Sequence, residues 1–159
     1  MARRGNGALT EPAALAPPDG LSAQLARGTA RLFAELGHSC LAEFRLRNGR
    51  RADLIAVAPD GGFSIVEIKS SIADYRADQK WQDYLPFCDR FYFCVAEDFP
   101  RDILPEETGL IIADAYGAAV LRESDTAPMH ASRRRALTLR YARTAGRRLM
   151  RHVDPAYGL

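Results

Sequence analysis

Three charged residues at the ends of two apolar segments could together do hydrolytic chemistry. Asp53 precedes the apolar run 54–57, whereas Glu67 and Lys69 follow the apolar run 63–66 as Glu-x-Lys. The sequence between the runs contains Pro-Asp-Gly-Gly, which favours a turn because proline presets φ, aspartate bonds the nearby backbone and glycine tolerates positive φ. The segment therefore predicts two strands joined as a β-hairpin, with the charged residues near its open end.

The register of this hairpin decides whether the charges meet. If Val57 pairs with Phe63 across a five-residue loop, antiparallel counting places Asp53 opposite Glu67, with Cβ atoms about 4.5–5.5 Å apart. Carboxylates that close repel each other unless a cation lies between them or one is protonated. A hard divalent ion between the two carboxylates would offset their repulsion, and the Lys69 ammonium beside it would complete a hydrolytic site. Solvated charges at strand ends are the alternative interpretation.

Two features of the sequence favour the metal site over solvated charges. Both strands are apolar on both faces, as in sheets covered by helices on each side, and buried charges need partners. In addition, only Lys69 and Lys80 are lysines among many arginines. A compact ammonium suits contact with a water nucleophile better than a guanidinium does.

The same residues carry a resemblance to a known family. Asp…Glu-x-Lys across a hairpin resembles the signature of the PD-(D/E)xK nuclease superfamily, and the longer sequence is similar to MmcB-like DNA-repair proteins over roughly residues 21–123. The similarity is carried by segments 43–53, 67–71, 78–84 and 87–93. It implies an α/β fold in which helices flank a restriction-endonuclease-like mixed sheet. It also implies DNA repair by Mg²⁺- or Mn²⁺-dependent hydrolysis of DNA phosphodiesters.

The resemblance assigns roles to individual residues. Asp53, Glu67 and Lys69 correspond to the catalytic set, and the metal ligands would be Asp53, Glu67 and the backbone carbonyl of Ile68. Many superfamily members add a glutamate from the first helix, but here the middle of that helix holds Gln24, Arg27 and Arg31. Glu43 on the first strand is the expected substitute, with a solvated carboxylate as the alternative. Gln79 and Lys80 are expected to approach the site from the following helix.

The missing helix glutamate keeps a second function open. A non-catalytic DNA-binding accessory or adaptor protein in DNA repair could retain the nuclease fold without cutting. The expected partners are therefore DNA and other repair proteins, and no membrane or small-molecule cofactor is expected.

Arginines suggest where a nucleic acid would bind. Arg50 and Arg51 follow an Asn-Gly turn beside the acidic residues, where they could hold phosphates or simply pair with Glu43 or Asp53. The segment from 126 to 153 has no acidic residue and predicts a basic amphipathic helix with Leu137, Tyr141, Ala145 and Leu149 on its apolar stripe. Its expected phosphate contacts are Arg133, Arg134, Arg135, Arg140, Arg143, Arg147 and Arg148. The alternatives are a docked helix with a solvated basic face or a membrane-surface helix.

Periodicity divides the chain into three parts. An Ala- and Pro-rich leader is expected over residues 1–20, a single nuclease-like domain over 21–125 and an Arg-rich helical tail over 126–159. Within the domain the pattern predicts helices over 21–36 and 74–85. The predicted strands cover 39–46, 89–96, 109–113 and 117–121, in addition to the two strands of the hairpin.

Composition excludes several other classes. The three cysteines form no Cys-x-x-Cys, and Cys88 and Cys94 lie among apolar residues, which favours reduced core thiols in a cytoplasmic protein. The three histidines are too scattered for a zinc site. No apolar run is long enough to span a membrane.

Overall fold

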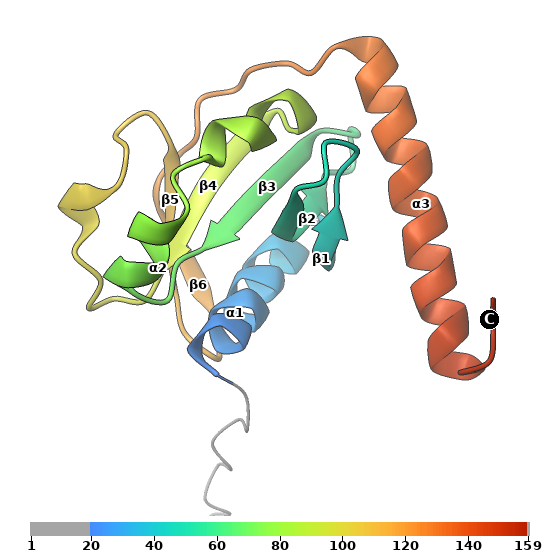
Figure 1. Cartoon of the computed structure of the whole chain (residues 1–159), viewed down its shortest axis with the longest axis horizontal. Coiled ribbons are helices and arrows are strands. Elements are labelled where there is room, and N and C mark those ends of the chain that lie inside the picture. The colour runs from blue at the N-terminus through green and yellow to red at the C-terminus, as the bar shows by residue number, and fades with distance from the viewer. Residues whose placement is uncertain (1–19, 159) are drawn as a thin grey trace, which may run out of the picture.

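The computed structural model describes residues 20–158 and has the expected α/β architecture, a mixed six-stranded sheet with helices on both faces (Figure 1). Its elements, in chain order, are α1 (Leu21–Glu35), β1 (Ser39–Arg45), β2 (Arg51–Val57), β3 (Phe63–Ile68), α2 (Ile72–Ala77), the 3-10 helix η1 (Trp81–Phe87), β4 (Arg90–Val95), the 3-10 helix η2 (Arg101–Ile103), β5 (Gly109–Ala113), β6 (Ala118–Arg122) and α3 (Ala131–Val153).

The strands lie side by side in chain order, β1 to β6. The pairs β1–β2, β2–β3 and β5–β6 are antiparallel, whereas β3–β4 and β4–β5 are parallel. The predicted register of the hairpin is confirmed, because Val57 pairs with Phe63. All six residues of β3 are buried, as expected for an apolar strand in the interior of a sheet covered on both faces.

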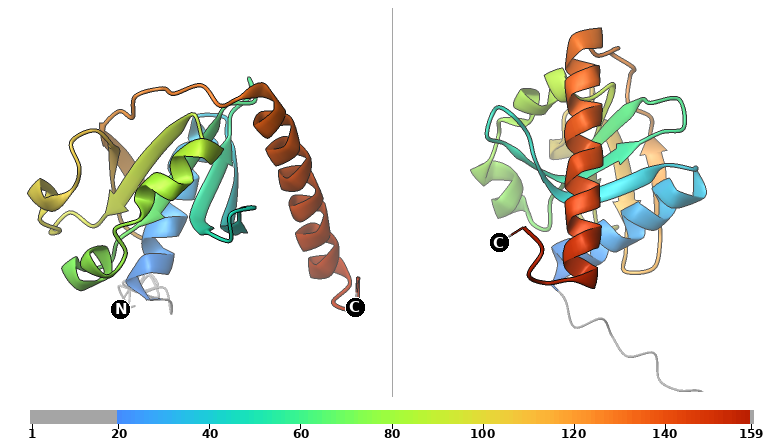
Figure 2. Two further views of the ribbon diagram at one scale, coloured as in Figure 1. Left: turned by 45° about the horizontal axis from the view of Figure 1, so that its top comes forward. Right: turned by 90° about the vertical axis from the view of Figure 1, so that its right-hand side faces the viewer.

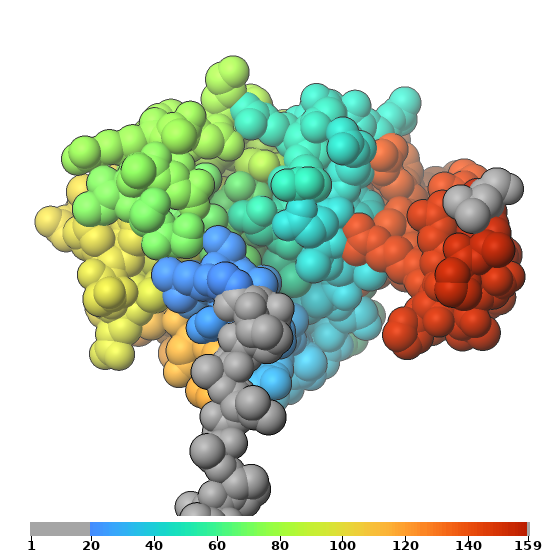
Figure 3. All heavy atoms as spheres, turned by 60° about the horizontal axis from the view of Figure 1, so that its bottom comes forward, coloured from blue at the N-terminus to red at the C-terminus, as the bar shows by residue number. Residues whose placement is uncertain are grey.

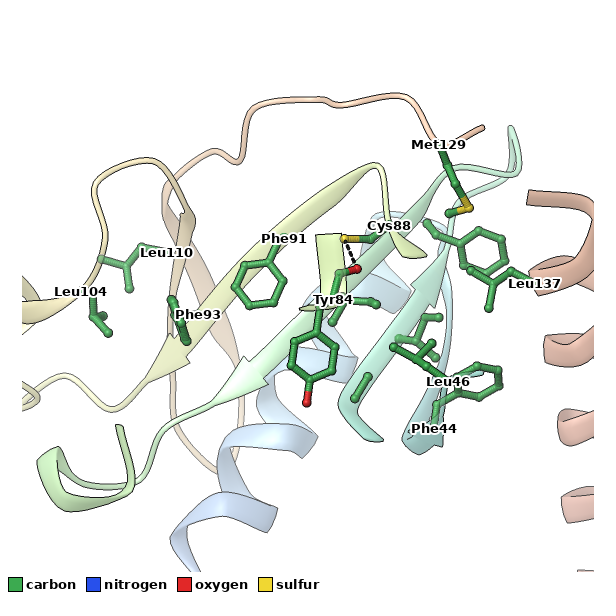
Figure 4. Close-up of a cluster of buried hydrophobic side chains, with 14 of the residues drawn as sticks. Phe44, Leu46, Tyr84, Cys88, Phe91, Phe93, Leu104, Leu110, Met129 and Leu137 are labelled. Carbon is green, nitrogen blue, oxygen red and sulfur yellow. Dashed lines mark hydrogen bonds between the residues drawn. The ribbon is translucent and has the colours of Figure 1, made fainter. Parts of the chain in front are cut away.

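Each face of the sheet has its own apolar core. On one face α1 packs Leu25 and Phe33 against residues of β2 to β5. On the other face, η1 packs against Phe91 and Phe93 (Figure 4), and Tyr141 in the first half of α3 packs against Phe63. Trp81 stacks on Phe91 with ring centroids 5.6 Å apart. The sheet is therefore held between two helical layers.

Two glycines position α1 on the sheet. Gly37 ends the helix with φ of 81°, a left-handed conformation that glycine adopts at little cost. A Cβ at Gly28 would lie 2.2 Å from the Asp114 carbonyl oxygen, so only glycine allows α1 to cross the β5–β6 turn this closely. The N-cap is Gly20, and Ser22 lies within the helix instead of capping it. The predicted leader up to residue 19 lies outside the described residues.

The helix predicted over residues 74–85 is wrong in one respect, since the segment forms two short helices, α2 and η1, separated at residues 78–80. Tyr75 and Trp81 both pack edge-on against the Phe93 ring, and Tyr84 stacks on Phe91. In one continuous α-helix Tyr75 and Tyr84, nine residues apart, would point in opposite directions. The break lets both tyrosines face the sheet.

A buried carboxylate fastens the start of α3 to the body. Asp89, whose side chain is 10% exposed, accepts hydrogen bonds from the backbone N–H groups of Phe63 (2.7 Å) and Met129 (2.9 Å). Both of its oxygens also accept from the Arg134 guanidinium, one of them at 2.8 Å. Burial raises the pKa of Asp89, but the bonds from Arg134, Phe63 and Met129 outweigh it and hold the pKa at about 2.

We expect Asp89→Ala to lower the free energy of unfolding by about 3–5 kcal/mol, because it leaves Arg134 and two buried N–H groups without their acceptor. Urea denaturation at pH 7 measures this change. Asp98→Ala, at an exposed position, is the matched control and should change stability little. Because the folded pKa is lowered, the contribution of Asp89 is present above its ordinary pKa of 3.8 and is lost as pH falls through about 2. Equal stability of the two variants would contradict this anchoring role.

The second half of α3 diverges from the body (Figure 2). Leu137 and Tyr141 are buried as predicted, but Leu149 is 65% exposed. Four-residue steps advance 400° around a helix, so Leu149 lies about 120° around the axis from Leu137. The predicted apolar stripe therefore cannot stay on one face along its whole length. No helix within residues 20–158 is both long and apolar enough to cross a membrane.

Candidate active site

Asp53 lies where the hydrogen-bond ladders on both sides of β2 are interrupted. The β2–β3 ladder stops at Leu54–Val66, and the β1–β2 ladder omits the position between Leu54 and Ala52. Side chains replace the missing bonds towards β3. The backbone N–H of Asp53 donates to Glu67 Oε1 at 3.2 Å, and the backbone N–H of Ile68 donates to Asp53 Oδ2 at 2.7 Å. Each carboxylate thus accepts a hydrogen bond from the backbone of the neighbouring strand.

The charges of Asp53, Glu67 and Lys69 act on one another. Glu67 is 4% and Lys69 5% exposed. Burial and the neighbouring charge of Asp53 raise the pKa of Glu67 to about 8, although the Lys69 ammonium opposes that shift. Burial is also the main reason why the pKa of Asp53 is raised, and Lys69 again opposes the rise. The hairpin therefore concentrates two carboxyl groups and one ammonium at the end of β3.

Tyr84 of η1 is a site residue that sequence reasoning missed. Its ring lies in the apolar core and its hydroxyl points out of that core (Figure 4). The hydroxyl donates to the Arg51 carbonyl at 3.1 Å, and its interaction with the Glu67 carboxylate lowers the pKa of Glu67. Burial, followed by the charges of Glu67 and Asp53, raises the pKa of Tyr84 itself. The nine-residue spacing from Tyr75, which fits no single helical face, was the available signal.

A cleft of about 1040 Å³ opens over these groups. It lies between the first turns of α1, the edge formed by β1 and β2, and the α2–η1 segment. Its polar lining residues are Ser22, Arg27, Glu43, Arg45, Arg50, Arg51, Asp53, Glu67, Lys69, Asp74, Asp78 and Tyr84. The cleft is thus lined by carboxylates at its centre and by several arginines.

Glu43 lies beside Asp53 in an uncommon backbone conformation. Its φ is 51°, the one positive value among the non-glycine residues described. The left-handed conformation coincides with the interruption of the ladder opposite Asp53, and non-glycine residues in this region carry strain that gathers at functional sites. The Glu43 carboxylate forms an ion pair with Arg51 at 2.7 Å, and its charge raises the pKa of Asp53. Its role as a metal ligand stays a prediction.

The donor set at the site suits a metal that keeps much of its water. Within residues 20–158, no group of three or more His, Cys, Asp or Glu side chains is arranged to hold a metal ion. Asp53 and Glu67 provide two carboxylates, and Asp53 Oδ1 makes no hydrogen bond within the same residues. Mg²⁺ is commonly held by one or two carboxylates, with waters and substrate phosphates completing its shell. The hairpin residues therefore fit such an ion.

Comparison with known proteins places the chain in a family. A family model described as "DNA repair protein MmcB-like" matches residues 17–156. The chain belongs to the MmcB-like DNA repair protein family. Among solved structures it is similar to the SPO1766 protein of unknown function from Silicibacter pomeroyi, with 39% identity and a TM-score of 0.86. That similarity covers 89% of this chain and 98% of the other. A search of curated proteins gives no match.

In this MmcB-like chain, the polar residues expected from the following helix do not reach the cleft. Gln79 and Lys80 are exposed at the break between α2 and η1, and the Gln79 amide donates to the Tyr75 carbonyl. Asp74 and Asp78 line the cleft instead. Asp74 Oδ2 accepts from the Ser70 N–H at 3.1 Å, and its charge raises the pKa of Asp53. Asp78 lies at the break in the predicted helix, whereas Asp74 lies in the first turn of α2.

The arginines expected to bind nucleic acid divide into three groups. Arg50 and Arg51 line the cleft, where Arg50 pairs with Asp78 and Asp83 and Arg51 pairs with Glu43. Four arginines of α3 bind the body: Arg133 lies over the Phe87 ring, Arg134 pairs with Asp89, and Arg140 and Arg148 donate to backbone carbonyls of β1. Arg135, Arg143 and Arg147 are exposed and make no ion pair within the part of the chain described.

Proposed function

We propose that this MmcB-like chain hydrolyses DNA phosphodiester bonds during repair, using Mg²⁺ or Mn²⁺. The observation that carries the proposal is the convergence of Asp53, Glu67 and Lys69 at an interrupted strand pair inside a cleft. Membership in a DNA repair family supports DNA as the substrate. The Asp…Glu-x-Lys pattern of the PD-(D/E)xK nucleases supports hydrolysis as the reaction.

The residues of the cleft would have separate roles in the hydrolysis. Asp53 and Glu67 would hold the metal, with the Ile68 carbonyl and Glu43 as further proposed ligands. The bound metal would polarise a phosphate oxygen and lower the pKa of a nearby water. The buried Lys69 ammonium would orient the attacking water and offset the negative charge that develops on the phosphate. Tyr84, which lines the cleft and lowers the pKa of Glu67, would favour the charged carboxylate that binds the metal.

The arginines at the mouth of the cleft would bind the DNA backbone. Arg45, Arg50 and Arg51 line the cleft on the β1–β2 side. Guanidinium groups bind phosphates through paired hydrogen bonds, and such contacts position DNA without reading its sequence. Arg50 and Arg51 also form ion pairs with acidic residues, so phosphate binding would exchange partners on these two side chains. Phosphate binding by α3 stays a prediction.

A panel of DNA substrates tests the proposal. Purified full-length protein is incubated with Mg²⁺ or Mn²⁺ and with linear, nicked or branched DNA, beside the Asp53→Ala variant. We expect the wild type to cleave at least one substrate and Asp53→Ala to lose about 10²–10³-fold in rate. Undiminished cleavage by Asp53→Ala would refute the assignment. DNA binding without cleavage on any substrate would instead favour the non-catalytic accessory function.

A further inference from the structure

The second half of α3 has little contact with the rest of the protein. Leu137 and Tyr141 pack into the core near the start of the helix. Towards its end, Arg148 reaches across to the carbonyls of Ala42 and Glu43 on β1. In the space-filling view an opening separates the end of α3 from the body (Figure 3). Most residues of this helix are exposed and therefore available to another molecule.

The face of α3 that points away from the body carries a second apolar stripe. Its members are spaced by alternating steps of three and four residues: Leu139, Ala142, Gly146, Leu149 and Val153. Leu139 is 61%, Leu149 65% and Val153 71% exposed. This alternation is the spacing by which one helix packs along another, and the stripe is about 21 Å long. A helix buried on one side only would carry polar residues here.

The residues at the centre of the stripe are small. Ala142 and Gly146 are exposed, and a Cβ added at Gly146 would meet nothing within 4 Å. Glycine is among the weakest helix formers, and no packing within the described residues requires it at this position. Small residues between larger apolar ones leave room for the side chains of an approaching helix.

The charges beside the stripe indicate which kind of molecule would bind there. Arg135 precedes the stripe by one turn, Arg143 and Arg147 lie beside it, and α3 contains eight arginines and no Asp or Glu. A second copy of α3 would bring arginines against arginines, and like charges at close range oppose association. DNA would match the arginines but would leave the leucines and Val153 uncovered. Helices that insert into membrane surfaces carry bulky apolar residues, whereas Ala142 and Gly146 lie at the centre here.

We propose that the outward face of α3 is a docking surface for an acidic amphipathic helix of a partner protein. The apolar side of that helix would cover Leu139, Leu149 and Val153. Its carboxylates would pair with the flanking arginines. This surface lies apart from the cleft, and docking there does not require the cleft to cleave DNA.

A designed peptide tests the docking surface. The probe is a fluorescein-labelled peptide of three heptads with leucines at the a and d positions and glutamates beside them. A control peptide has the same composition with its leucines moved out of register. Fluorescence anisotropy with the full chain should give a Kd of about 100 µM or tighter for the probe. Binding of the control peptide should be at least about 10-fold weaker.

Variants of exposed leucines localise the binding. We expect Leu139→Gln/Leu149→Gln to weaken peptide binding at least about 10-fold, and Leu121→Gln, an exposed leucine on β6, to leave it unchanged. All three side chains are exposed, so thermal melts should match the wild type. No binding of the probe, equal binding of both peptides or equal binding by the double variant would overturn the proposal.

Parallel titrations identify the competing occupants. A short DNA duplex and anionic phosphatidylglycerol vesicles replace the peptide, and sedimentation velocity reports self-association. We expect Leu139→Gln/Leu149→Gln to leave DNA binding, vesicle binding and self-association unchanged. If the double variant abolished DNA binding, vesicle binding or dimer formation and spared peptide binding, the surface would belong to that other occupant and the proposal would be wrong.

Discussion

Lys69→Met should lower the rate of metal-dependent DNA cleavage by about 10²–10³-fold, the usual effect of removing one group that stabilises developing charge in a transition state. Lys69 is almost fully buried beside both carboxyl groups, so no solvent cation can occupy its position. Methionine has a similar length and is apolar, which keeps the packing and removes only the ammonium. Single-turnover cleavage measures the effect.

The other lysine of the chain gives a matched control. Lys80 is exposed outside the cleft, and Lys80→Met should cleave at the wild-type rate. The Lys69 ammonium lowers the pKa of Asp53 and Glu67, so its loss should weaken metal binding near neutral pH. Rates are therefore compared at saturating Mg²⁺ and at two pH values. A Lys69→Met rate within twofold of wild type under these conditions would remove lysine from the mechanism.

Glu67→Gln should abolish Mg²⁺ binding at the cleft, and the pH dependence of that binding in the wild type should follow the Glu67 carboxyl. With a pKa of about 8, the Glu67 carboxyl of the metal-free protein is mostly protonated at pH 7. A metal that binds its carboxylate must displace that proton, so we expect the wild type to release close to one proton per Mg²⁺ at pH 7. Affinity should rise as pH increases from 6 to 9. Calorimetry in buffers of different ionisation enthalpy measures both quantities.

The raised pKa of Glu67 also affects how the stability of the fold depends on pH. A folded pKa above the ordinary value of 4.5 contributes stability that is fully present below pH 4.5 and is lost as pH rises through about 8. Without metal, the wild type should therefore melt at a lower temperature at pH 9 than at pH 6. Glu67→Gln should not show this loss. Mg²⁺ should raise the melting temperature of the wild type but not that of Glu67→Gln.

Glu35→Gln is the control for these measurements. Glu35 is exposed at the last turn of α1, away from the cleft, and its variant should behave like the wild type. Proton release that persists in Glu67→Gln would show that another carboxyl group takes up the metal. Identical melting curves of wild type and Glu67→Gln at pH 9 would contradict the burial of a charge at this position.

The sequence by itself determined the hairpin and the charges that it carries. The Pro-Asp-Gly-Gly turn and the apolar runs on either side act over fewer than twenty residues, so their register follows from local geometry. Val57 therefore pairs with Phe63 as predicted, and Asp53 meets Glu67. The order of helices and strands was predictable for the same reason, because each follows from a periodic pattern along a short segment.

Only the tertiary structure decided which other residues join the site and where α3 lies. Tyr84 reaches Glu67 because the segment after β3 breaks to place two tyrosines on one face of the sheet. Glu43 takes its left-handed conformation where β1 meets β2 opposite Asp53. The outward stripe of α3 became evident once Leu137 and Tyr141 fixed the other face of the helix in the core. These outcomes depend on contacts between segments far apart in the chain, which local periodicity does not specify.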